Sequence, residues 1–185
     1  MRILHTSDWH LGHTLHGLSR EEEHARFIAW LLDLVRDEVP DALIIAGDVF
    51  DTACPPARSE RAFFDFLAEA RRRAPGIDIV IVGGNHDSAL RLESTARVLK
   101  ALNVHVVGSL QRSAKGPLNT ERLLAPLHDS EGRVGAWVAM IPFLRPSDLP
   151  ASTPDVDDAE SPLVSGVRAT YTAVLEAARE RRLPG

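Results

Sequence analysis

The stretch from Ala42 to Asp51, ALIIAGDVFD, decides the fold of this 185-residue chain. Its first half, Ala42 to Ala46, is a continuous apolar run, which is the pattern of a strand buried on both faces of a parallel sheet. Its second half, Gly47 to Asp51, places two carboxylates directly after that strand. Because ligands of an open α/β sheet bind beyond the carboxyl ends of its strands, this junction predicts a buried sheet with a site at its edge.

Segments on either side of this stretch extend the same pattern. Three more short apolar runs read as strands, and amphipathic segments with helical spacing separate them. The predicted strands are Arg2 to Thr6, Ile77 to Val82 and Val104 to Val107, and the predicted helices begin near Ser19, near Ser59 and at about Leu90, the last running to Leu102. Strands that alternate with helices predict parallel pairing with right-handed crossovers, and therefore an α/β fold.

The second part of the chain has a different composition, with more polar, turn-forming and proline residues. The segments are predicted as follows: a turn-rich Gln111 to Arg133 with at most one weak strand around Glu121 to Leu124, an edge or second-sheet strand from Val134 to Ile141, a loop from Leu144 to Ser161, and a last helix that begins at Ser161-Pro162. The chain stops at Gly185, where another strand is expected. We therefore expect residues 1–185 to be the N-terminal part of a domain whose remainder is absent.

Composition excludes several classes of protein. With 44% hydrophobic and 25% charged residues, the chain is neither disordered nor collagen-like. A net charge of −5 gives no general attraction to nucleic acid, so any DNA binding must come from a local site. The single cysteine, Cys54, excludes an internal disulfide, and no stretch approaches the roughly 18 apolar residues of a membrane span. We expect a cytoplasmic protein with no membrane partner.

Polar residues follow the first and third predicted strands as they follow the second. Ser7-Asp8-Trp9-His10 comes after the first strand, and Gly84-Asn85-His86-Asp87 comes after the third. Carboxylate, imidazole and amide ligands without thiolate suit Mn²⁺, Mg²⁺, Fe²⁺ or Zn²⁺. One central aspartate can bridge two ions about 3.5–4 Å apart, which is the arrangement that activates water and clamps a phosphoryl group. The three strand ends together predict a divalent metal site.

The motifs D-x-H, G-D-x-x-D and G-N-H-D, in this order and spacing, resemble those of the calcineurin-like metallophosphoesterase superfamily. The longer strings SDWHLG, AGDVFDTACPP, GGNHDS and IPFLRP are similar to its SbcD-like nuclease subunits, over Met1 to about Pro146. The resemblance implies a sandwich of two β-sheets flanked by helices, incomplete here because the chain ends early. It also implies a metal-dependent DNA exonuclease and endonuclease of double-strand break processing, which hydrolyses phosphodiester bonds with metal-activated water.

The resemblance also implies the metal ligands. Carried over by motif, Asp8 and His10 would bind the first metal, Asp48 would bridge both metals, and Asn85 would bind the second. Two divalent ions are implied, with Mn²⁺ expected and Mg²⁺ as the alternative. No substrate-binding residue can be named from the motifs.

Two further residues would serve catalysis. His86 would lie near the scissile phosphate, stabilising the transition state or protonating the leaving oxygen, and Asp51 would orient His86. The family completes its site with a later Gly-His and a Gly-His-x-His, yet after Asp87 only His105 and His128 follow, and neither lies in such a motif. The second metal site is therefore expected to be incomplete, and this polypeptide alone is expected to hydrolyse DNA very poorly and to hold metal weakly.

The resemblance implies partners as well: DNA, an SbcC-like ABC-type ATPase with a coiled coil, and a second copy in a homodimer of the full-length protein associated with the nucleoid. Two other functions stay open at this point. One is a phosphomonoesterase or cyclic nucleotide phosphodiesterase, and the other is a noncatalytic scaffold that keeps the phosphoesterase fold.

Structural roles are expected for several other polar residues: Asp87 as a turn or helix cap, His13 and His16 as solvated loop residues, His105 as a packed residue, and His128 as a surface residue in a turn.

Overall fold

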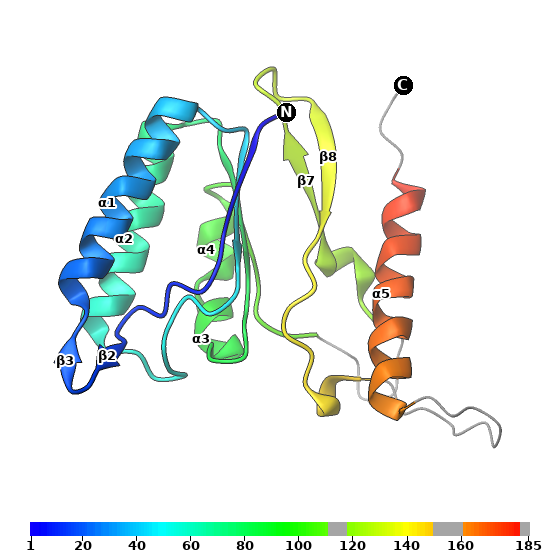
Figure 1. Ribbon diagram of the computed structural model, residues 1–185. Coiled ribbons are helices and arrows are strands. Elements are labelled where there is room, and N and C mark those ends of the chain that lie inside the picture. Colours follow the sequence, from blue (N-terminus) through cyan, green and yellow to red (C-terminus); the bar gives the residue numbers. More distant parts are fainter. Residues whose placement is uncertain (111–117, 150–160, 182–185) are drawn as a thin grey trace.

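The computed structural model in Figure 1 describes residues 1–110, 118–149 and 161–181. Its centre is a four-stranded sheet in the order β1–β4–β5–β6, and every neighbouring pair is parallel. The strands are β1 (Ile3–Thr6), β4 (Ala42–Ala46), β5 (Asp78–Val82) and β6 (Val104–Val107). Since all four run in one direction, their carboxyl ends share one edge of the sheet. The predicted α/β fold with a parallel sheet and flanking helices is confirmed.

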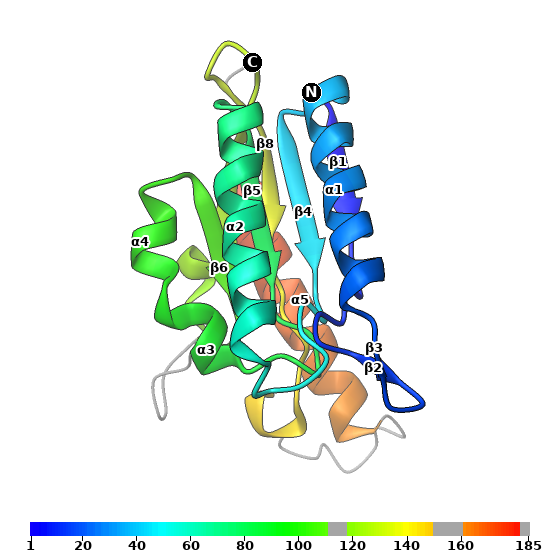
Figure 2. The same cartoon turned by 90° about the vertical axis from the view of Figure 1, so that its left-hand side faces the viewer.

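One face of this sheet is covered by helices, which Figure 2 shows in front of the strands. They are α1 (Glu21–Glu38), α2 (Ala57–Arg73), α3 (Ala89–Ser94) and α4 (Ala96–Lys100). The last two replace the single helix predicted from Leu90 to Leu102, because the chain breaks at Thr95, which caps α3 and opens α4.

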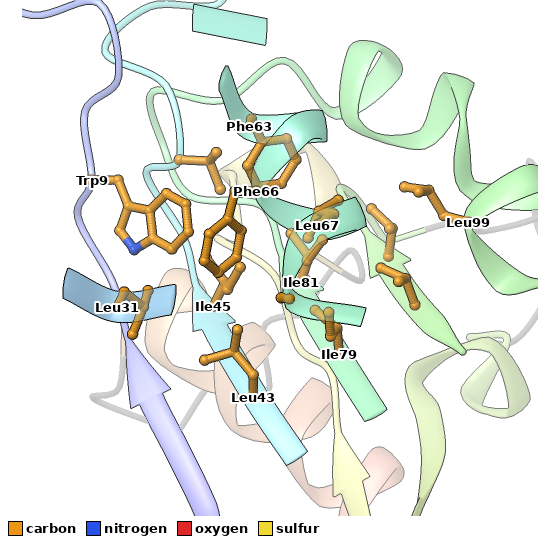
Figure 3. Close-up of a cluster of buried hydrophobic side chains, with 14 of the residues drawn as sticks. Trp9, Leu31, Leu43, Ile45, Phe63, Phe66, Leu67, Ile79, Ile81 and Leu99 are labelled. Carbon is orange, nitrogen blue, oxygen red and sulfur yellow. The ribbon is translucent and has the colours of Figure 1, made fainter. Parts of the chain in front are cut away.

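The main hydrophobic core lies between these helices and the sheet (Figure 3). Alternate strand residues such as Ile45 and Ile81 point toward the helices and are fully buried. Phe63 and Phe66 of α2 and Trp9 from the loop after β1 complete the cluster, and the rings of Trp9 and Phe66 meet edge to face at 4.9 Å between centroids. A buried aromatic at position 9 anchors the loop that carries the first motif to the core.

The opposite face of the sheet packs on a second, smaller sheet. Strands β7 (Leu124–His128) and β8 (Val134–Ala139) pair antiparallel, and α5 (Pro162–Glu180) covers their outer side, as Figure 1 shows. A second core cluster joins both sheets to Val174 of α5. Three short elements complete the fold: a hairpin of β2 (Thr14–Leu15) and β3 (Leu18–Ser19), and 3₁₀ turns at Thr120–Leu123 and Pro146–Asp148. The two packed sheets confirm the predicted sandwich.

Two expectations for the second half of the chain were wrong. The weak strand expected around Glu121 to Leu124 begins only at Leu124, and Pro126 in its middle hides it from pattern analysis, since proline is rare inside sheets. His128 is a half-buried residue at the end of this strand, where its backbone N–H and its Nδ1 lie 2.6 and 2.9 Å from Asp78 Oδ2.

Parts of the predicted loops, residues 111–117 and 150–160, lie outside the described residues. Among the helices that the structure does describe, none combines the length and the apolar character needed to cross a membrane.

Candidate metal centre

The loops after β1 and β4 run together because the pairing of these strands continues past their ends. The backbone N–H of Asp8 donates to the carbonyl of Gly47 at 3.1 Å, and that of His10 donates to the carbonyl of Asp48 at 3.0 Å. A parallel bridge then joins Leu11 to Phe50. The first two motifs are therefore held side by side by main-chain hydrogen bonds, independently of any ion.

The candidate ligands lie on backbone in the left-handed conformation, which sets the direction of their side chains. Asp8, His10 and Asp48 have φ angles of 57°, 47° and 49°, a region that aspartate, asparagine and histidine enter more readily than other side chains. The third loop approaches the same point through Gly84, where a Cβ atom would overlap the carboxylate of Asp48. A glycine is therefore required at position 84 for the loop after β5 to reach the site.

Asp87 ties the second loop to the third. Its buried carboxylate, 2% exposed, accepts hydrogen bonds from the backbone N–H groups of Val49 at 3.2 Å, Phe50 at 3.0 Å and Gly84 at 2.9 Å. Its role is structural, as predicted, although it joins two loops instead of capping a turn or a helix. These bonds satisfy backbone donors that would otherwise be buried without partners.

Three of the four predicted metal ligands converge at this edge. Nε2 of His10 lies 3.9 Å from a carboxylate oxygen of Asp8 and 3.9 Å from one of Asp48, and the three ligand atoms lie within 4.8 Å of one another. Asn85 lines the same cavity of about 520 Å³ as Asp8 and Asp48, and Phe143 and Tyr171 belong to the same lining. Oxygen and nitrogen donors that lie this close together without bonding to each other fit a divalent ion.

The two predicted catalytic residues lie beside these ligands. Nδ1 of His86 is 2.7 Å from the backbone carbonyl of Asp51, and the backbone N–H of His86 donates to Oδ1 of Asp48 at 3.0 Å. The rings of His86 and His10 meet edge to face at 4.9 Å. The resemblance implies that Asp51 orients His86, and in the structure this contact is made by the Asp51 carbonyl. The Asp51 carboxylate lies closest to His13 and His10, and one of its oxygens and ring nitrogens of His10 and His86 lie within 4.8 Å of one another.

The surroundings of His86 favour its protonated form. The hydrogen bond to the backbone of Asp51 raises the pKa of the His86 imidazole, partial desolvation opposes this change, and the nearby carboxylates of Asp48, Asp51 and Asp87 add to it. A carbonyl oxygen only accepts, so the proton on Nδ1 stays in that bond. Nε2 is therefore the ring atom at which His86 can exchange a proton.

His13 was expected to be a solvated loop residue, but it is part of this cluster. Its Nδ1 lies 2.9 Å from Oδ1 of Asp51. Gly12, with a φ of 95°, turns the chain so that the backbone N–H of His13 donates to the carbonyl of His10 at 3.0 Å. The only signal in the sequence is a glycine between two histidines three residues apart, which many loops share.

The sequence profile described as "Calcineurin-like phosphoesterase" matches residues 1–137. Two similar curated proteins are both named as the SbcD component of the nuclease SbcCD. The one from Rhodobacter capsulatus is 48% identical over 150 residues, which cover 81% of this chain and 37% of that protein. The one from Escherichia coli K12 is 40% identical over 149 residues, which cover 80% of this chain and 34% of that protein.

A third relative with the same name, from Bacillus subtilis, is 44% identical over 108 residues, or 58% of this chain and 27% of that protein. The chain thus matches about a third of the length of these relatives. The profile match covers well over half of the chain and contains all three motif loops. On this evidence, the chain belongs to the calcineurin-like phosphoesterase family.

Proposed function

We propose that this chain is part of an SbcD-like nuclease subunit, a metal-dependent phosphodiesterase that acts on DNA in double-strand break processing. The observation that carries the proposal is the convergence of Asp8, His10 and Asp48 from two loops at one sheet edge, beside a cavity that Asp8, Asp48 and Asn85 line. The family match and three relatives named as nuclease components support this substrate class.

In this proposal the site holds two divalent ions, Mn²⁺ in preference to Mg²⁺. Asp8 and His10 would bind the first, Asp48 would bridge both, and Asn85 would bind the second. An imidazole among the ligands favours Mn²⁺, because Mg²⁺ prefers oxygen ligands and keeps several waters. When bound, such ions polarise the phosphoryl oxygens and lower the pKa of water.

The protein groups supply orientation and a proton. Asp51 holds Nδ1 of His86 through its backbone carbonyl, and the backbone N–H of His86 is tied to Asp48. His86 is thus fixed on the residue that would bridge the ions, with Nε2 left to protonate the leaving oxygen or to stabilise charge on the phosphate. Asp51 acts by orienting His86.

We further propose that residues 1–185 form the N-terminal part of the nuclease domain, because the matched relatives extend well beyond the shared stretch. The rest of the second metal site would come from beyond this stretch, so the chain alone would bind metal weakly and cleave DNA very poorly. The full-length protein would form a homodimer, associate with the nucleoid in the cytoplasm, and work with an SbcC-like ABC-type ATPase that has a coiled coil. The relatives' name describes them as one component of an SbcCD nuclease, which supports such a complex.

The test compares this chain with the full-length product of its gene on end-labelled duplex DNA with Mn²⁺. We expect the full-length protein to cleave DNA, and the 185-residue chain to be slower by about 100-fold or more, since it lacks part of the site. Hydrolysis of nitrophenyl phosphate without DNA cleavage would show a phosphomonoesterase instead. No hydrolysis of either substrate by the full-length protein would show the noncatalytic scaffold.

A further inference from the structure

Asp51 is surrounded by three imidazoles. Its Oδ1 lies 2.9 Å from Nδ1 of His13 and 3.4 Å from Nδ1 of His10, and its backbone carbonyl lies 2.7 Å from Nδ1 of His86. Of these three histidines, His13 has no role in the function proposed above. The position of Asp51 at the centre of the group gives His13 an indirect route to the candidate ligands.

The ring of His10 must have a defined tautomer to serve as a ligand. Its Nε2 lies 3.9 Å from carboxylate oxygens of Asp8 and Asp48, and to bind an ion beside them Nε2 needs a free lone pair, which puts the proton on Nδ1. That Nδ1 atom is buried and makes no hydrogen bond of normal geometry. The nearest charged acceptor is Oδ1 of Asp51, and ligating histidines in proteins commonly direct their second N–H to such a carboxylate.

The contact with His13 holds the Asp51 carboxylate in that place. The backbone supports both partners, because the N–H of Asp51 donates to the carbonyl of Leu11 at 3.2 Å and the N–H of His13 donates to that of His10. The carboxylate of Asp51 is about a quarter exposed, so without His13 it is free to rotate toward water. The His13 ring therefore acts on the His10 ring through the Asp51 carboxylate.

We propose that His13 is a positioning residue of the metal centre. By donating from Nδ1 to Asp51 Oδ1, it keeps this carboxylate beside Nδ1 of His10, which leaves the lone pair of Nε2 on the side of Asp8 and Asp48. The inference rests on the proposed function only for the identity of the ion that His10 receives. The arrangement of Asp51, His10 and His13 is a property of the metal-free chain.

The first test measures the His10 tautomer in the metal-free chain by long-range ¹H–¹⁵N NMR at about pH 8.5, well above the ordinary pKa of an imidazole in a peptide. In the wild type we expect a single Nδ1–H tautomer for His10. His13→Leu should give a mixture with the Nε2–H form, and His13→Asn should restore the single form because its amide nitrogen takes the place of Nδ1. His16→Asn is the matched control, because His16 is exposed in the turn of the neighbouring β2–β3 hairpin.

The second test measures Mn²⁺ affinity by calorimetry for the same variants. His13→Leu should weaken binding about 5- to 10-fold, toward the lower end of the effects seen for residues that orient a ligand, while His13→Asn and His16→Asn stay near the wild-type value. An unchanged tautomer and affinity in His13→Leu, or equal losses in His16→Asn, would overturn the inference. Neither measurement needs DNA cleavage, so a full-length protein that does not cut DNA would refute the proposed function and leave this inference standing.

Discussion

The two ends of the parallel sheet use the same residue types in opposite ways. At the carboxyl ends, His10 stays 3.9 Å from Asp8 and Asp48, so the ligand atoms are beyond hydrogen-bond distance. At the other end, Asp78 is 1% exposed and one of its oxygens receives both the backbone N–H and Nδ1 of His128. The first group has donor atoms to offer a ligand, whereas in the second the histidine is already bound to its aspartate.

The difference shows that aspartate and histidine indicate a metal site only when other groups make the contacts that hold the loops together. At the carboxyl ends, Asp87 and the main-chain bonds between the loops hold the structure together, which leaves the Asp8 carboxylate and Oδ2 of Asp48 available, while Oδ1 of Asp48 accepts from the His86 N–H. At the amino ends, the Asp78–His128 pair itself joins β5 to β7. Substitutions in the two regions should therefore separate stability from metal binding.

Asp87→Ala should have the largest effect and should reduce both properties. It leaves three backbone N–H groups without acceptors, so we expect a loss of about 3–5 kcal/mol in the free energy of unfolding. Mn²⁺ binding should weaken as well, because Val49 and Gly84 flank the loops that carry Asp48 and Asn85. Urea unfolding and calorimetry measure the two effects, with Asp65→Ala on the exposed face of α2 as control. A stability within about 0.5 kcal/mol of the wild type would show that Asp87 does not hold the loops.

Asp78→Ala should affect stability alone. Removal of this carboxylate leaves the His128 N–H unpaired between the sheets, and we expect a loss of about 2–3 kcal/mol. Because the pair lies at the far end of the sheet, Mn²⁺ affinity under folding conditions should stay within twofold of the wild-type value. The same two measurements apply. A large loss of affinity in a folded protein would contradict the separation between the two ends.

Asp48→Asn should weaken metal binding and leave stability nearly unchanged, the opposite of Asp78→Ala. Asparagine tolerates the left-handed backbone and keeps an acceptor for the His86 N–H, so the free energy of unfolding should change by less than about 1 kcal/mol. Loss of the charge that faces His10 should weaken Mn²⁺ binding by roughly 10- to 100-fold. Calorimetric titration at constant pH measures this loss. Wild-type affinity in this variant would remove Asp48 from the ligand set.

The smallest effect concerns the pH dependence of stability near Asp78. Burial lowers the pKa of His105, Lys100 and His128 act in the same direction, and the Asp78 carboxylate opposes them. The folded state therefore binds fewer protons at His105 than the unfolded state, and stability should fall as the pH falls below about 6.5. His105→Gln should flatten this decline, whereas His16→Asn should not. Urea midpoints at pH 7.5 and 5.5 test this, and identical slopes in wild type and His105→Gln would refute it.

The sequence predicts the carboxyl edge well because topology alone brings its residues together. Once the strands before Asp8, Asp48 and Asn85 are recognised as parallel neighbours, the three loops must emerge at one edge. No rotamer information is needed for that step, and none is available from the sequence. For this reason the position of the Asp51 carboxylate, closest to His13 and His10, could not be predicted.

The opposite end could not be predicted, because its contacts depend on packing between distant segments. Asp78 and His128 are 50 residues apart and belong to different sheets. Pro126 also hides the strand that brings His128 to Asp78, so the turn expected there left this histidine on the surface. Only the packing of the two sheets on each other reveals the pair.

The left-handed backbone at Asp8, His10 and Asp48 also restricts how this centre can be redesigned. Valine, isoleucine and threonine are strongly disfavoured at such angles, whereas asparagine, aspartate, histidine and glycine fit them. An engineer who wished to change the preferred ion by exchanging these donors would have few side chains to choose from. Selectivity would have to be altered from the surrounding groups, where the backbone is ordinary and the choice of side chain is wider.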